Sequence, residues 1–82
     1  EEAGAIGSAM VAMSAGDAAT ALERLRGADQ TPAVLAFSAM AHGQMGAHHL
    51  AAELAEDLEA MDADPALVEI AKSAADQTAS VG

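Results

Sequence analysis

The chain has 82 residues and is 52 % hydrophobic, but 24 of its hydrophobic residues are alanine, and Phe37 is the only aromatic residue. Thirteen acidic side chains against three lysine and arginine side chains give a net charge of −10. So little bulky apolar material argues against a β-sandwich, a barrel or a large catalytic cleft. The charge argues against nucleic acid and anionic membranes as partners, because proteins bind both through lysine and arginine.

The first two helices are predicted from the residues that end and begin them. One helix is expected over about residues 4–15, with Gly16 in the left-handed conformation that ends it. Asp17 is a suitable N-cap for a second helix over about residues 18–26, and Gly27 follows that helix. No stretch alternates apolar and polar residues with the period of two that strands need, so no strand is predicted.

Further along the chain, a capping residue followed by proline occurs twice, at Thr31–Pro32 and at Asp64–Pro65. The helix after Pro32 either ends near Gly46 or continues as one long helix that Gly43 and Gly46 weaken. The sequence therefore predicts an all-α fold, a small bundle of four to five short antiparallel helices in a single domain.

An internal repeat is the most informative pattern. Ser8-Ala9-Met10 recurs as Ser38-Ala39-Met40 and Gly16 recurs as Gly46, 30 residues later. Asp29-x-x-Pro32 recurs as Asp62-x-x-Pro65 after 33 residues, so about three residues near 47–49 are extra in the second copy. The pattern indicates a duplicated helical hairpin. The alternative is a plain bundle whose caps happen to be evenly spaced.

The repeated unit resembles the tetratricopeptide-repeat family, whose helix-turn-helix units have about 34 residues and close on proline. The matching residues are Gly16-Asp17, Ala21-Leu22-Glu23, Leu25, Ala28 and Pro32 in the first copy and Gly46, Ala51 and Pro65 in the second. The first helix of the unit departs from the family, with small residues in place of its bulky signature. The resemblance implies two hairpins over about 4–30 and 32–62, a capping helix over about 65–78, and a concave groove that binds a peptide or partner helix.

Histidine and methionine form one candidate site. On a helix, His42, Met45 and His49 are spaced i, i+3 and i+7 and lie near one face. Imidazole and thioether ligands suit a soft ion such as Cu(I), so a metal-binding helical bundle is an alternative function. The other interpretation is surface histidines beside methionines that fill gaps in the core. No organic cofactor is expected.

His42 also allows a second alternative. With a glycine four places later, it is similar to the phosphorylated histidine of histidine phosphotransfer domains. The lysine that follows the histidine in that family is missing here, so its charge is not available to neutralise a phosphoryl group.

Small residues recur every four positions along the first helix, at Gly4, Ser8, Ala12 and Gly16. Such a face allows a neighbouring helix to approach closely. We expect it to be covered, either by the second helix of the same chain or by a second copy in a homo-oligomer.

Acidic residues are concentrated in one segment, which we call the acidic strip: Glu53, Glu56, Asp57, Glu59, Asp62 and Asp64. The strip is either a solvated face or a docking surface for the lysine and arginine side chains of a basic protein partner.

The sequence contains no G-x-S-x-G motif and no phosphate-binding glycine loop, which argues against an enzyme. No run approaches the roughly 18 apolar residues of a transmembrane helix. We therefore predict a cytoplasmic, non-enzymatic protein–protein interaction module that self-associates and presents an acidic surface to a basic partner.

Overall fold

The computed structural model describes residues 2–81 of the chain, and side chains are described for residues 4–76. Within this range the chain forms helices and no strand, which confirms the predicted all-α bundle. The helices are α1 (Glu2–Ser14), α2 (Ala18–Arg26), α3 (Pro32–Gln44), α4 (His48–Ala60) and α5 (Pro65–Val81).

The predicted capping residues begin their helices. Asp17 accepts hydrogen bonds from the backbone N–H and the hydroxyl of Thr20, at 3.3 and 2.7 Å. The Thr31 hydroxyl accepts one from Val34 N–H at 3.3 Å, and Asp64 accepts one from Ala66 N–H at 2.9 Å. These bonds satisfy N–H groups that have no partner inside a helix. Among α2 to α5, α4 alone departs from this pattern, because its N-cap is Ala47, whose side chain offers no acceptor.

Three turns between helices share one geometry. Gly16 and Gly46 have φ angles of +81° and +84°, in the left-handed region that glycine enters without strain. Asp62 takes the same place after α4 with a φ of +59°, which the sequence did not predict. The turn at Gly46 also answers the question left open above: the helix ends there, so His42 and His49 belong to different helices.

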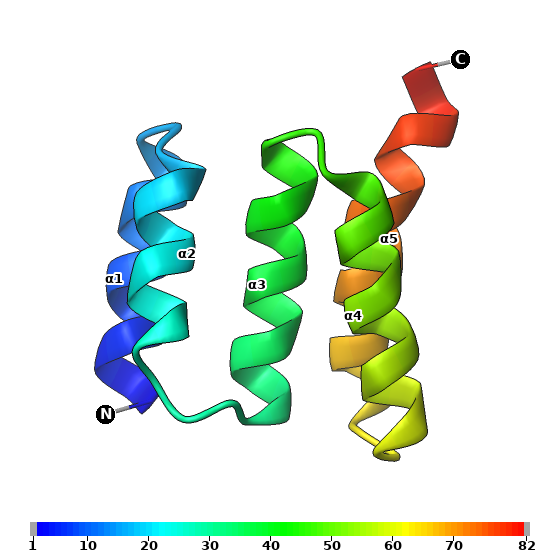
Figure 1. The fold of residues 1–82 in the computed structure, drawn as a ribbon, viewed down its shortest axis with the longest axis horizontal. Coiled ribbons are helices and arrows are strands. Elements are labelled where there is room, and N and C mark those ends of the chain that lie inside the picture. Colours follow the sequence, from blue (N-terminus) through cyan, green and yellow to red (C-terminus); the bar gives the residue numbers. More distant parts are fainter. Residues whose placement is uncertain (1, 82) are drawn as a thin grey trace.

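The five helices form a flat arrangement of 35 × 29 × 16 Å in which α3 is central (Figure 1). On one side α3 packs against the pair α1 and α2, and on the other against the pair α4 and α5. In the described part of the chain, α1 and α2 make no close backbone contact with α4 or α5. The two helix pairs are therefore joined through α3.

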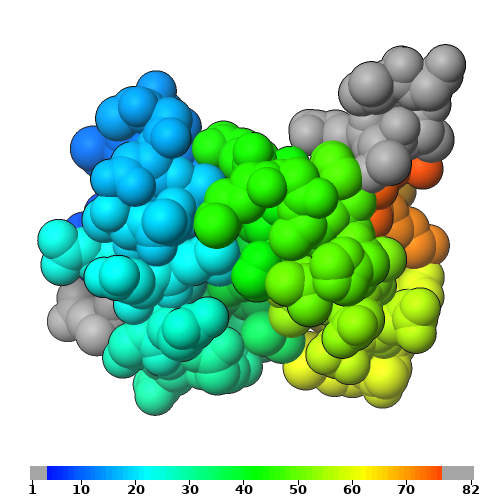
Figure 2. Space-filling model, turned by 45° about the horizontal axis from the view of Figure 1, so that its top comes forward, coloured from blue at the N-terminus to red at the C-terminus, as the bar shows by residue number. Residues whose placement is uncertain are grey.

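Two separate hydrophobic clusters follow from this arrangement, and α3 contributes to both. One cluster lies between α1, α2 and α3 and is centred on Leu25, with Val34 and Ala41 from α3. The other lies between α3, α4 and α5 and is centred on Leu58, with Ala36 and Ala39 from the opposite side of α3. In Figure 2 the green surface of α3 and α4 accordingly lies between the blue and cyan residues and the yellow and orange ones.

No helix in the described range combines the length and the apolar character that crossing a bilayer requires.

Candidate binding groove between α3 and α5

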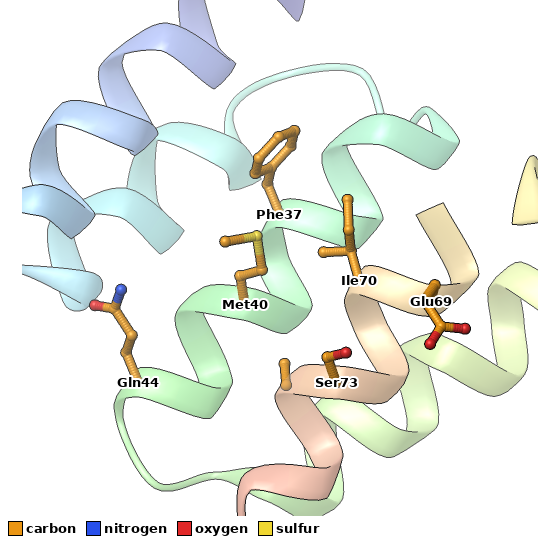
Figure 3. Close-up of a pocket in the computed structure, with 7 residues that line it drawn as sticks. Phe37, Met40, Gln44, Glu69, Ile70 and Ser73 are labelled. Carbon is orange, nitrogen blue, oxygen red and sulfur yellow. The ribbon is translucent and has the colours of Figure 1, made fainter. Parts of the chain in front are cut away.

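An apolar groove of about 410 Å³ lies between α3 and α5, two helices that are not consecutive in the chain. Its walls are Phe37 and Met40 from α3 and Ile70 and Ala74 from α5, and all four are partly or fully buried. Phe37 and Met40 also pack against the hydrophobic cluster between α1, α2 and α3. Figure 3 shows Phe37 and Met40 on the same side of α3, next to Ile70 across the groove. The groove thus presents a row of apolar side chains to the surface.

A close approach of the two backbones closes one end of the groove. A Cβ atom placed on Gly43 would lie 3.0 Å from the carbonyl oxygen of Ala74 and 3.1 Å from its Cβ. His48 Nδ1 lies 3.1 Å from the same carbonyl oxygen, a hydrogen bond in the tautomer that carries its proton on Nδ1. Gly43 therefore lets α5 approach the end of α3 closely, and the His48 hydrogen bond joins the start of α4 to α5 at the same place.

Acidic side chains border the groove on the α5 side. Glu69 lines the groove and also lines a neighbouring surface pocket together with Glu59, Asp62 and Lys72. The Lys72 ammonium is held by Glu59 at 2.6 Å, and this hydrogen bond and charge raise the pKa of Lys72. Because Lys72 forms an ion pair with Glu59, the charges of Asp62 and Glu69 are left over, and the net charge beside the groove is negative.

Of the predicted metal ligands, His42 lies on α3 and His49 on α4, and the charge of His49 contributes least among the causes that lower the pKa of His42. The spacing argument was wrong in its premise, since no single helix carries all three residues. Met45 lies in the turn after α3 and is 54 % exposed. Among the described residues no group of three or more histidine, cysteine or carboxylate side chains is placed to hold a metal ion. Binding of Cu(I) and phosphotransfer through His42 stay predictions.

The stripe of small residues on α1 is not covered by α2. Gly4, Ser8 and Gly16 are exposed, and only Ala12 is half-buried. The α1 residues that pack against α2 are instead Ala9 and Met13, which lie on a different line of the helix. Ser8 and Ala12 line an open hollow together with Thr20 and Arg24 of α2, and the role of the stripe as a helix-packing face stays a prediction.

All residues of the acidic strip are exposed, but three of them have local structural roles. Glu59 pairs with Lys72, Asp62 forms the left-handed turn and Asp64 caps α5. The remaining three, Glu53, Glu56 and Asp57, form no ion pair with any residue in the described part of the chain.

The groove was not predicted from the sequence, although Phe37, Met40 and Ile70 are apolar residues within helical segments. Helical spacing alone places such residues in a core. The signal that distinguishes them is the combination of bulky residues at 37, 40 and 70 with small residues at 43 and 74, which opens a wedge between two helices.

Comparisons of this chain with protein-family models, with curated proteins and with solved structures find no match.

Proposed function

We propose that this protein is a non-enzymatic interaction module that binds an amphipathic, basic helix of a partner protein in the groove between α3 and α5. The observation that carries the proposal is the groove itself: half-buried apolar side chains from two helices line one open depression with a negative border. A partner helix would lay its apolar face on Phe37, Met40 and Ile70, a known mode of helix recognition.

The shape of the groove favours a helix as the ligand. Both walls are helices, and the 13 residues of α3 extend for roughly 20 Å, about the length of a short recognition helix. The resemblance to tetratricopeptide repeats supports the same interpretation. In that scheme α1, α3 and α5 are equivalent helices, and the family binds partners in the groove that such helices line.

The charge of the chain favours a basic ligand. The net charge is −10. Glu69 lies at the border of the groove, and it lines the neighbouring surface pocket together with Glu59 and Asp62. Lysine or arginine residues on the outer side of a bound helix would be attracted to this border and steered toward it from a distance.

A designed amphipathic peptide tests this proposal, with leucine along one helical face and lysine along the other. Fluorescence anisotropy of the labelled peptide should show saturable binding to the wild-type protein. Met40→Glu should weaken binding at least about tenfold, because it places an unpaired carboxylate in the apolar groove. Met45→Glu is the matched control, since it introduces the same charge at an exposed turn outside the groove, and it should change the affinity less than about twofold.

A charge reversal at the border provides a variant with little risk to folding, because Glu69 is exposed. Glu69→Lys should weaken the binding of the lysine peptide and strengthen the binding of a peptide that has glutamate in place of lysine. No saturable binding of the lysine peptide, or equal losses from Met40→Glu and Met45→Glu, would contradict the proposal.

Self-association uses a different surface in this proposal, the outer side of α1. Val11 is 72 % exposed and Met10 is 50 % exposed, and α1 has no charged residue after Glu2. A chain of charge −10 meets least repulsion from its own copy through such an uncharged face. Sedimentation equilibrium should show a dimer that Val11→Glu dissociates. A wild-type protein that stays monomeric at millimolar concentration would contradict self-association. That result would not bear on the proposed binding of a partner helix in the groove.

A further inference from the structure

A second, smaller cavity of about 130 Å³ lies between α2, α3 and α4, and none of its lining residues belongs to the α3–α5 groove. Its lining residues are Leu22, Arg26, Gln30, Ser38, His42 and Leu54. In Figure 2 the cyan surface of α2 lies beside the green surface of α3 and α4 in this region. The cavity combines two leucine walls with several hydrogen-bond donors, and no carboxylate lines it.

Arg26 has no counter-charge in the described part of the chain. The chain contains 13 acidic side chains and only three lysine and arginine side chains, yet Arg26, like Arg24, forms no ion pair with any described residue. Arg26 differs from Arg24 in that it lines the cavity. An arginine that is not neutralised in so acidic a protein is available to a ligand of opposite charge.

Two further donors lie on the α3 side of the cavity. Ser38 and His42 are four residues apart on α3 and therefore share one face of the helix. The side-chain amide of Gln30 is occupied, since it donates to the carbonyl oxygens of Leu25 at 3.2 Å and Ala28 at 2.8 Å. These bonds satisfy carbonyl groups at the end of α2 and leave Arg26, Ser38 and His42 as the donors for a ligand.

His42 is partly buried, and Arg26 lines the same cavity. Burial lowers the pKa of His42 most, and the charges of Arg26 and His49 lower it further. Bonds to a charged ligand are stronger beside apolar walls such as Leu22 and Leu54, because less water competes for them.

From this geometry we propose that the cavity between α2, α3 and α4 binds a small oxyanion, the carboxylate or phosphate group of a ligand. Arg26 binds two of its oxygens through the guanidinium, and Ser38 and His42 donate to the others. The volume admits one such group and no extended chain. This binding is independent of the partner helix in the α3–α5 groove.

Titrations followed by two-dimensional ¹H–¹⁵N NMR test the proposal, with sodium phosphate and sodium acetate as the probes and sodium chloride holding the ionic strength constant. Saturable shifts of the backbone signals of Ser38 and His42 are expected. Saturation by phosphate alone identifies a phosphate-bearing ligand, and saturation by acetate identifies a carboxylate. Shifts that stay linear with both probes would overturn the proposal.

The matched variants are Arg26→Gln and Arg24→Gln, which remove the same charge from the last turn of α2. Arg24 lines a different surface hollow, between α1 and α2. Arg26→Gln should weaken anion binding at least about tenfold, as expected when a charged hydrogen bond is lost, and Arg24→Gln less than about twofold. Arg26→Lys should bind the anion with intermediate affinity, because lysine keeps the positive charge but lacks the planar guanidinium that can donate to two oxygens at once. Equal losses from Arg24→Gln and Arg26→Gln would show a nonspecific charge effect and overturn the proposal.

Discussion

At the scale of single residues, Gly43 determines how closely α3 and α5 pack. The atoms that a side chain would meet are the backbone oxygen and the Cβ of Ala74, neither of which can rotate away. A larger residue must therefore displace α5 as a whole. From the sequence, Gly43 is identified only as a weak point of a helix, because its contact with Ala74 joins positions 31 residues apart.

Gly43→Val is expected to lower the free energy of unfolding by about 1–3 kcal/mol, the usual cost of overpacking. Urea denaturation followed by circular dichroism measures this change. Gly7→Ala is the matched control, since a Cβ there meets no atom within 4 Å. It should raise the stability by up to about 1 kcal/mol through helix propensity alone. An unchanged stability in Gly43→Val would contradict the close approach of α3 and α5.

His42 makes the stability depend on pH. Burial, Arg26 and His49 hold its pKa below the ordinary value of 6.5, so the folded state prefers the neutral imidazole. The stabilisation is complete above pH 6.5 and decreases as the pH falls from 6.5 toward the lower pKa of the folded state. His42→Gln should therefore lose less stability than the wild type between about pH 7.5 and 5.5. Identical pH profiles would contradict this prediction.

Residues with local signals were predictable and those with distant partners were not. The caps Asp17 and Thr31 and the left-handed Gly16 act within a few residues of their own position, so the sequence was sufficient to assign them. Asp62 occupies the same left-handed position as Gly16 but carries a side chain that rarely adopts it, and so it was missed.

At the scale of the helices, α1 and α3 look alike in sequence and differ in structure. Both are rich in alanine and methionine and have apolar residues on all sides. Such a pattern predicts a helix that is covered all round but does not say by what. In α3 both sides are covered, by the α1–α2 pair and the α4–α5 pair, whereas α1 leaves Val11 exposed.

The two hydrophobic clusters should respond separately to mutation. Leu25→Ala and Leu58→Ala each remove a fully buried side chain, at a cost of about 2–5 kcal/mol. Because the backbones of the two helix pairs come close to each other only through α3 in the described range, hydrogen exchange in Leu25→Ala should accelerate most in α1 and α2. In Leu58→Ala it should accelerate most in α4 and α5. Uniform acceleration along the chain in both variants would show a single cooperative core instead.

At the scale of the whole molecule, charge repulsion opposes folding. The net charge is −10, and Glu53 and Asp57 lie one helical turn apart on α4 with no counter-charge in the described part of the chain. The melting temperature should therefore rise as sodium chloride is increased from about 10 to 500 mM, since added salt screens such repulsion. A variant with Glu53→Gln and Asp57→Asn should melt higher at low salt and depend less on salt. A melting temperature that is the same at both salt concentrations would contradict this view.

The candidate site was less predictable than the fold because it depends on how non-consecutive helices pack together in the whole molecule. The groove requires Phe37 and Ile70 to lie side by side, and no pattern in the sequence links two helices that are separated by α4. The acidic character of the surface was predictable from composition alone, but the position of Glu69 on the border of the groove was not.

The five methionines provide the most direct test of the binding groove, because their methyl groups report on different surfaces. Met40 lines the groove, Met13 is buried, and Met10, Met45 and Met61 are exposed elsewhere. With ¹³C-labelled methionine methyl groups, addition of the leucine–lysine peptide should shift the Met40 signal and give contacts between the Met40 methyl group and the leucines of the peptide. Peptide contacts to Met10, Met45 or Met61 in place of Met40 would contradict the groove between α3 and α5 as the binding site.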